Sequence, residues 1–189
     1  MLYLMPTSRA GHTAQHGEAL FLLSEALYAE YGIRHGLLLR ETHGKPVLEN
    51  APPHCSLSHC AGLVACALDQ QPLGVDAEHI RQLRPRVVER VCTEAEQQWI
   101  LSAQQPDLAF TRIWTLKESF VKAIGTGIAY PMREVAFSLS ENTIRCSDPR
   151  FGFTQYLTAD GFVIALCHAG GENRCIAIPA CTALRQLSL

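Results

Sequence analysis

The sequence lacks the features that would place it in a membrane or along nucleic acid. No apolar run among its 189 residues approaches the ~20 needed to span a bilayer. Residues 1–13 show no basic segment followed by a long apolar stretch, so no secretory signal is expected. The formal net charge of −2 excludes a generally basic nucleic-acid binder, although it permits a local basic patch. The 48% hydrophobic content instead predicts a folded protein with a substantial core.

The sequence also lacks paired cysteine motifs. None of its eight cysteines forms a C-x-x-C pair, and several lie in apolar runs, as Cys66 and Cys167 do. We therefore expect small buried thiols in a reducing cytoplasm. A disulfide framework is the alternative, but a chain of this length does not need one to fold.

Lysine is scarce, although arginine is not. Three of the 16 basic residues are lysine, at Lys45, Lys117 and Lys122, and the other 13 are arginine. A compact ammonium on a flexible stem suits a phosphate that is approached as a point charge. Two of the three lysines fall within residues 114–122, which marks this segment as a candidate phosphate-binding site.

Periodicity and end signals predict helices at residues 13–31, 84–91, 94–101 and 107–124. Gly32 and Gly125 are expected to end the first and the last of them. Thr93 and Glu96 fit a capping box at the start of the third, and Asp107 is the expected N-cap of the fourth.

Short apolar runs predict strands between these helices and after them. The turn Asp160-Gly161 should join two of them as a hairpin, and the close spacing of residues 62–68 and 73–77 suggests a second hairpin. The predicted fold class is therefore α+β with mostly antiparallel sheets, in two parts that meet near Pro72. The predicted strands are residues 37–40, 56–58, 62–68, 73–77, 135–140, 143–147, 151–159, 162–168 and 175–179.

Two carboxylates end one predicted strand in the segment Gly74-Val75-Asp76-Ala77-Glu78. Because residues two apart in a strand share a face, Asp76 and Glu78 should lie side by side. Close carboxylates repel each other unless a cation lies between them, and Mg²⁺ prefers such oxygen ligands. The alternative is two solvated carboxylates at a strand end, which this short pattern alone does not exclude.

A second group of charges lies in the predicted helix, in the segment WTLKESFVK of residues 114–122. Trp114, Glu118 and Lys122 are spaced at i, i+4 and i+8 and share a face. An exposed Glu–Lys pair is the simplest interpretation, but apolar residues surround much of this helix. Buried charges need partners, and Glu118 alone cannot satisfy both Lys117 and Lys122, so a phosphate-rich ligand is indicated.

These two motifs, about 40 residues apart, resemble the signatures of the 4'-phosphopantetheinyl transferase superfamily: a G-[IV]-D-x-E strand and a W-x-x-K-E-[SA]-x-x-K helix. The turn Gly44-Lys45-Pro46 and the segment SLSHC at residues 56–60 are similar to two further family elements. Length and the GKP turn favour the surfactin-synthetase-activating type. That resemblance implies a monomer of two pseudo-symmetric halves, each a helix packed on a mostly antiparallel sheet. Residues 1–72 would form the half on the coenzyme A nucleotide side, and residues 73–189 would carry the metal-binding and catalytic motifs. The active site would lie in the cleft between the two halves.

The resemblance also implies a role for each site residue. The reaction would transfer phosphopantetheine from coenzyme A to a serine of an apo acyl or peptidyl carrier protein and release 3',5'-ADP. Asp76, Glu118 and, directly or through water, Glu78 would bind Mg²⁺. Glu118 or a metal-bound water would take the serine proton, and Lys122 would neutralise the pyrophosphate. The nucleotide end would be held by Lys45, Ser58 and His59, and Lys117 would either touch the pyrophosphate or pair with Glu118.

The chain departs from the family pattern at several positions, one of which is Ala77, where the family often has Ile. Ser56 stands where the family usually has Asn, and Cys60 where it has Ser or Thr. Glu18 stands in the first helix where relatives carry an arginine for the 3'-phosphate, so Arg9, His12 or His16 would have to substitute. A catalytically weakened module that binds carrier protein or coenzyme A is therefore an alternative, and a Mg²⁺-dependent nucleotide hydrolase is a second one.

An arginine cluster follows the acidic strand and is the candidate carrier-binding surface. Carrier proteins are usually acidic around the modified serine, so this cluster could steer them toward the cleft. A solvated helix face is the alternative. The cluster comprises Arg81, Arg84, Arg86 and Arg90, with Arg112 and Arg133 expected nearby.

Overall fold

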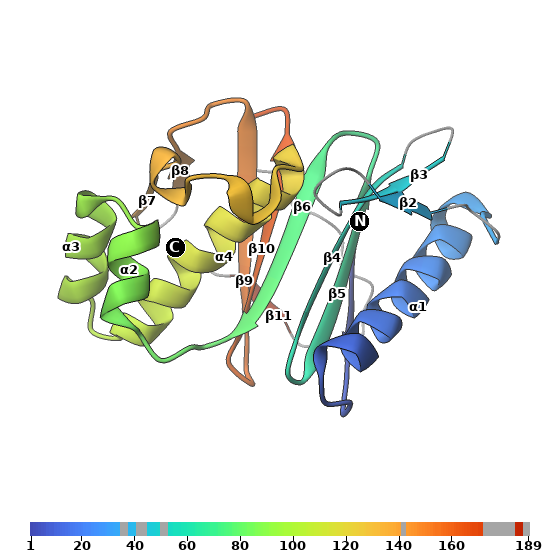
Figure 1. The fold of residues 1–189 in the computed structure, drawn as a ribbon, viewed down its shortest axis with the longest axis horizontal. Helices are drawn as coiled ribbons and strands as arrows, with labels where there is room; N and C mark the ends of the chain where they lie inside the picture. The colour runs from blue at the N-terminus through green and yellow to red at the C-terminus, as the bar shows by residue number, and fades with distance from the viewer. Residues whose placement is uncertain (35–37, 41–44, 50–52, 141–142, 172–183, 187–189) are drawn as a thin grey trace.

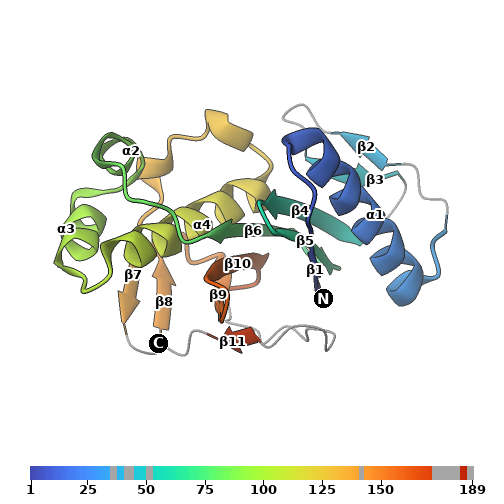
Figure 2. The same cartoon turned by 90° about the horizontal axis from the view of Figure 1, so that it is seen from below.

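The computed structural model describes residues 1–34, 38–40, 45–49, 53–140, 143–171 and 184–186. Two antiparallel sheets lie side by side, each covered by a long helix (Figures 1 and 2). This arrangement confirms the predicted α+β class with mostly antiparallel pairing.

The first sheet has the strand order β1-β5-β4 and contains β1 (Leu2–Pro6), β5 (Leu63–Asp69) and β4 (His54–Cys60). Helix α1 (His12–Tyr31) packs on it through an apolar stripe that includes Leu23 and Leu27. It ends at Gly32, whose φ of 69° is the left-handed conformation that glycine adopts without strain. A short hairpin of β2 (Leu38–Arg40) and β3 (Pro46–Leu48) lies beside this sheet.

The second sheet has the order β11-β9-β10-β6. Helix α4 (Pro106–Ile124) packs on its face. Helices α2 and α3 lie at one end of α4, and the ribbon pair β7–β8 lies beside β9 (Figures 1 and 2). The elements of this half are β6 (Leu73–His79), α2 (Pro85–Val91), α3 (Glu94–Ser102), β7 (Phe137–Ser140), β8 (Thr143–Cys146), β9 (Phe151–Thr158), β10 (Phe162–Ala169) and β11 (Leu184–Gln186), with 3₁₀ turns at Gly127–Ala129 and Met132–Glu134.

Alternation along the strands builds three cores. Val64, Cys66 and Leu68 of β5 face α1, whereas Leu63, Ala65 and Ala67 enter a core shared with β6 and β10. On β6, Leu73, Val75 and Ala77 enter that shared core. The intervening residues Gly74 and Asp76 therefore lie on the face toward α4, and the third core fills the space around α4.

Serine hydroxyls, rather than a backbone ladder, join the two sheets where β4 meets β6. The backbone N–H of Val75 donates to Ser56 Oγ at 3.0 Å, and that of Ala77 donates to Ser58 Oγ at 3.1 Å. Both donors would otherwise be buried without a partner, which costs roughly 1–3 kcal/mol per group. The two serines thus close the seam between the halves.

Several predicted elements are confirmed closely. The capping box is present, with Thr93 Oγ1 accepting from the N–H of Glu96 and the Glu96 carboxylate accepting from the N–H of Thr93. Helix α4 ends at Gly125, in the left-handed conformation, and Asp160-Gly161 joins β9 to β10 as a hairpin. The predicted strand at residues 175–179 lies outside the described residues.

Two local predictions are wrong. Strands β5 and β6 do not form a hairpin, because β5 pairs with β1 and β4 and β6 pairs with β10. Both strands instead bury an apolar face in the shared core, so the turn before β6 carries the chain from one sheet to the next. Asp107 is not an N-cap: α4 starts at Pro106, and the Asp107 carboxylate accepts from the N–H of Leu83 at 2.8 Å.

Candidate active site

Close packing of α4 on β6 brings the two sequence motifs together. A Cβ atom on Gly74 would lie 2.0 Å from the carbonyl oxygen of Ser119 and 2.5 Å from the nitrogen of Ala123. Only glycine permits this approach of strand and helix backbones. Since Glu118 and Lys122 directly precede these two helix residues, the contact holds both beside Asp76 on β6.

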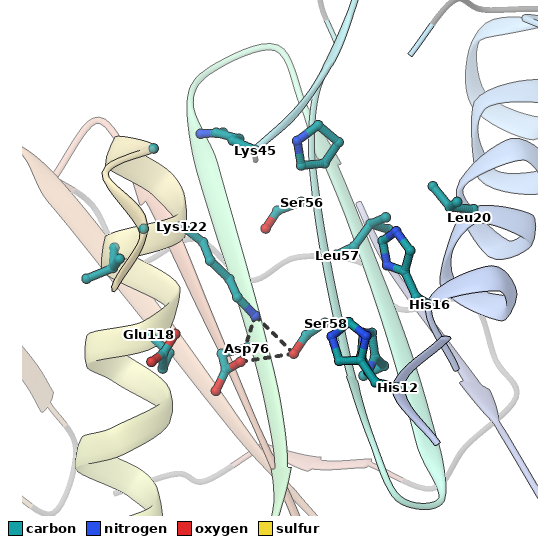
Figure 3. A pocket seen from close by; sticks show the side chains of 15 residues that line it. His12, His16, Leu20, Lys45, Ser56, Leu57, Ser58, Asp76, Glu118 and Lys122 are labelled. Atoms are coloured by element: carbon teal, nitrogen blue, oxygen red, sulfur yellow. Dashed lines mark hydrogen bonds and ion pairs between the residues drawn. The ribbon is translucent and has the colours of Figure 1, made fainter. Parts of the chain in front are cut away.

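A polar network of three side chains links the strand, the helix and the first half (Figure 3). Lys122 Nζ lies 2.8 Å from Asp76 Oδ1 and 3.1 Å from Ser58 Oγ. The Ser58 hydroxyl in turn donates to Asp76 Oδ1 at 2.9 Å. Asp76 is only 5% exposed, so the Lys122 ammonium is the counter-charge that makes its burial tolerable.

A pocket of about 570 Å³ opens over this network, between α1 and β4 on one side and β6 and α4 on the other. Five sequence-predicted residues line it together with Asp76: Lys45, Ser58, His59, Glu118 and Lys122. Lys45 also donates from Nζ to the carbonyl of Ala123 at 2.6 Å, which ties the β3 side of the pocket to the end of α4. Glu78 does not line the pocket.

Glu118 is the pocket residue whose acidity the fold changes most clearly. Burial raises the pKa of Glu118 to about 7, and the neighbouring Asp76 charge adds to the rise while Lys122 opposes it. A carboxyl group that titrates near neutral pH can accept a proton during a reaction under physiological conditions.

Glu78 lies at the edge of the same acidic group. Trp114 Nε1 donates to Glu78 Oε1 at 3.3 Å, and Arg81 pairs with the same oxygen at 2.9 Å. Burial raises the pKa of Glu78, and repulsion from Asp76 is the second cause. The three acidic side chains therefore repel one another, which is the electrostatic condition under which a cation binds.

The chemistry of these donors suits a hard divalent cation. Asp76 Oδ2 is buried and has no hydrogen-bond partner in the structure, so one carboxylate oxygen is left over for a ligand. Among the described residues, no three His, Cys, Asp or Glu side chains are already arranged as a metal ligand set. The carboxylates fit Mg²⁺ by type and charge, and binding would require local adjustment around Lys122.

The structure corrects the interpretation of Lys117. This side chain is fully buried and pairs with Glu96 at 2.9 Å rather than with Glu118. Its Nζ also donates to the carbonyl oxygens of Met132, at 2.8 Å, and Val135, at 2.5 Å. Lys117 faces away from the pocket and anchors α4 to α3, so its charge is satisfied without a phosphate.

Sequence reasoning gave little weight to two pocket residues on α1, His12 and His16. Both line the pocket together with His59. Their spacing of four residues places them on one helix face, which was the available signal. Glu18 faces elsewhere: it accepts a hydrogen bond from Thr7 and pairs with Arg9 at 3.3 Å.

Comparison with known proteins identifies the family that shares these motifs. The family model described as the 4'-phosphopantetheinyl transferase superfamily matches residues 72–167, which hold both motifs and the α4–β6 contact. The chain belongs to the 4'-phosphopantetheinyl transferase superfamily. The superfamily match confirms the resemblance drawn from the motifs.

Named relatives fall within this superfamily. The chain is 33% identical to 4'-phosphopantetheinyl transferase psf-1 of Bacillus pumilus over 135 residues, covering 67% of this chain and 58% of the relative. It is 33% identical to 4'-phosphopantetheinyl transferase gsp of Aneurinibacillus migulanus over 120 residues, covering 59% and 50%. These matches support the surfactin-activating type. The chain spans about half the length of these two relatives.

A solved structure of a superfamily relative is also similar. It is the crystal structure of Thermotoga maritima holo-[acyl-carrier-protein] synthase, with a TM-score of 0.44 and 26% identity over 55% of this chain and 64% of that one.

In the described part of the chain, no helix has the length and apolar character that crossing a membrane requires.

Proposed function

We propose that this chain transfers the 4'-phosphopantetheine group of coenzyme A to a serine of an apo acyl or peptidyl carrier protein. The observation that carries the proposal is a titratable carboxyl, Glu118, beside the Asp76–Lys122 pair in a pocket of about 570 Å³. Membership of the 4'-phosphopantetheinyl transferase superfamily supplies the reaction class.

In the proposed step, the serine hydroxyl oxygen attacks the phosphorus atom that bears the pantetheine arm. A new P–O bond forms, the bond from that phosphorus to the bridging pyrophosphate oxygen breaks, and 3',5'-ADP leaves with the bonding electrons. Glu118 accepts the serine proton, and the Lys122 ammonium balances the negative charge on the phosphoryl oxygens. Phosphoryl transfer needs mainly positioning and charge neutralisation, which these residues supply.

The other residues that the sequence assigns to the site would hold the donor. Asp76 and Glu118, with Glu78 directly or through water, would ligate Mg²⁺, which when bound neutralises the pyrophosphate oxygens. Lys45, Ser58 and His59 would hold the nucleotide end. The buried oxygen Asp76 Oδ2, which lacks a hydrogen-bond partner, supports a cation ligand at this point.

We further propose that the chain works as a cytoplasmic monomer of two halves, residues 1–72 and 73–189, with the pocket between them. The seam of serine hydroxyls between β4 and β6 supports this division. The six cysteines in the described part of the chain are free thiols, which suits a reducing compartment.

The carrier protein would dock beside α2. Arg84, Arg86 and Arg90 are exposed there, at the helix start and along the helix, so they can attract an acidic partner. Arg81 is exposed as well, but it pairs with Glu78 and packs over Trp114. Arg112 donates to Gln155 at 2.8 Å and belongs to the core contacts of α4 rather than to this surface.

The proposal is tested by incubating the protein with coenzyme A, Mg²⁺ and an apo carrier protein and weighing the carrier. A mass gain of one phosphopantetheine group is expected. Coenzyme A breakdown without that gain would indicate a hydrolase, and neither product would indicate a binding module. Either of these results would refute the proposed transfer.

A further inference from the structure

Arg81, three residues after Glu78, supplies a positive charge beside the candidate metal ligands. Its guanidinium Nη1 lies 2.9 Å from Glu78 Oε1, and its Cζ lies 5.0 Å from the centre of the Trp114 ring. Its charge acts on Glu118 as well as on Glu78. Arg81 does not line the pocket, and the proposed transfer step makes no use of it.

One oxygen of Glu78 accepts from a neutral donor and from a charged one. Trp114 Nε1 donates to Glu78 Oε1 at 3.3 Å, beside the Arg81 guanidinium. A neutral N–H can stay on a carboxylate that ligates a metal ion, as hydrogen-bond donors behind metal ligands commonly do. A guanidinium carries a full positive charge, so it opposes a cation bound to the same carboxylate. Trp114 can therefore hold Glu78 in place after Arg81 has left it.

Two cations pair with the acidic group in the described part of the chain, and Arg81 is the easier one to displace. The side chains of the Arg81–Glu78 pair are 42% and 25% exposed, against 29% and 7% for the Lys122–Asp76 pair. A half-exposed ion pair contributes little stability, because water screens it and both side chains lose freedom. A divalent cation that competes for Glu78 therefore meets little resistance from Arg81.

The backbone at Arg81 is fixed, so only the side chain has to move. The N–H of Arg81 donates to Thr111 Oγ1 at 2.9 Å, and the N–H of Leu83 donates to the Asp107 carboxylate at 2.8 Å. Both acceptors belong to α4. A released guanidinium would join the exposed basic surface that continues with Arg84 at the start of α2.

We propose that Arg81 is an exchangeable counter-ion, which neutralises Glu78 until a divalent cation binds and then turns outward to an acidic partner protein. The inference rests on the proposed function for the identity of that partner, an apo carrier protein. Metal and carrier bind cooperatively, because the metal releases the guanidinium that the carrier attracts. By linkage, each raises the affinity for the other by the same factor.

Binding of Mn²⁺, which takes the same oxygen ligands as Mg²⁺, tests the exchange at Glu78. Electron paramagnetic resonance of free Mn²⁺ gives the dissociation constant without any enzymatic reaction. Arg81→Met should bind Mn²⁺ about three- to tenfold more tightly than wild type, since the competing charge is gone while Trp114 still holds Glu78. The control Arg145→Met, which removes the same charge from an exposed position on β8, should match wild type. Equal or weaker binding by Arg81→Met would overturn the exchange.

Tryptophan emission follows the guanidinium itself. The chain has two tryptophans, so the emission of a Trp99→Phe protein reports Trp114 alone. Saturating Mg²⁺ should shift this emission, because the cation–π contact between Arg81 and the Trp114 ring is lost. The shift should shrink when Arg81→Met is added. An unshifted spectrum of the Trp99→Phe protein would refute the exchange even if Arg81→Met did not fold, and so would an equal shift in the presence and absence of Arg81.

Carrier affinity tests the cooperative binding. The probe is an apo acyl carrier protein whose acceptor serine is replaced by alanine, so that it binds without being modified. Its Kd should fall about threefold or more when Mg²⁺ is added to wild type, and should not respond to Mg²⁺ with Arg81→Met. A wild-type Kd that is the same with and without Mg²⁺ would refute the coupling.

The outcome is separable from that of the proposed function, because Mn²⁺ binding and tryptophan emission require no transfer. Phosphopantetheine transfer by wild type, together with Mn²⁺ binding that Arg81→Met does not strengthen, would refute the exchange alone. Stronger Mn²⁺ binding by Arg81→Met without transfer by wild type would refute the proposed transferase activity and leave the exchange intact.

Discussion

Replacing Gly74 with alanine should disrupt both stability and activity, because this glycine sets the distance between β6 and α4. The added Cβ would lie 2.0 Å from Ser119 O, 2.5 Å from Ala123 N and 3.0 Å from Ser119 C. All three are backbone atoms of α4, so no side chain can rotate to relieve the clash. The helix would have to move by about 1–1.5 Å to restore ordinary van der Waals contact.

The size of the effect follows from that displacement. Overpacking of this kind costs about 1–3 kcal/mol of unfolding free energy, and occasionally more. Glu118 and Lys122 would move with the helix, away from Asp76, and a misplacement of about 1 Å can reduce a reaction rate about 100-fold. Urea unfolding measures the first effect, and phosphopantetheine transfer at a temperature where the variant is folded measures the second.

Gly17→Ala is the matched control. Gly17 lies within α1, where an added Cβ meets nothing within 4 Å and the backbone φ is not positive. Alanine there should raise the unfolding free energy by about 0.5–1 kcal/mol through helix propensity. If Gly74→Ala matched wild type in both stability and transfer, the argument that the α4–β6 contact positions the site would be wrong.

Three further predictions concern charged residues. Glu118→Gln should abolish transfer. Because burial raises the pKa of Glu118 to about 7, the stability of the wild-type protein falls as the pH rises from about 4.5 through 7. Without divalent ions, the variant should therefore be more stable than wild type by roughly 1–3 kcal/mol at pH 8 and should lose this advantage at pH 4. An equal difference at both pH values in urea unfolding would contradict the assigned burial. Lys117→Met should cost about 3–5 kcal/mol of unfolding free energy, since it leaves the buried Glu96 carboxylate without its partner. The wild-type Lys122 side chain is 29% exposed, so Lys122→Met should cost less stability but should lose transfer. The reverse order of stability losses would contradict the two assignments. Reversing Arg84 and Arg86 to Glu should raise the carrier KM and flatten its salt dependence, and unchanged values of both would exclude these arginines from carrier docking.

Sequence reasoning succeeded where the signal is local. The Thr93–Glu96 capping box and the glycine at position 125 are decided within one helical turn, and both appear where they were predicted. The class of fold followed in the same way from alternation within each strand. The association of Asp76 with Glu118 came from matching two motifs, since nothing in either segment alone brings them together.

Sequence reasoning failed where the outcome depends on partners distant in the chain. The sequence indicated either the pyrophosphate or the neighbouring Glu118 as the partner of Lys117, but its actual partner is Glu96, 21 residues earlier on α3. The serine hydroxyls that close the β4–β6 seam were unforeseeable, because they replace a backbone ladder. The pocket histidines come from both α1 and β4, so only the folded chain brings them together.

The most direct test of the account is the mass of an apo carrier protein after incubation with wild-type protein, coenzyme A and Mg²⁺, compared with the Glu118→Gln variant under the same conditions. We expect the wild-type protein to add one phosphopantetheine group to the carrier serine and the variant to add none. An unmodified carrier with the wild-type protein, or a carrier modified equally by both proteins, would contradict it.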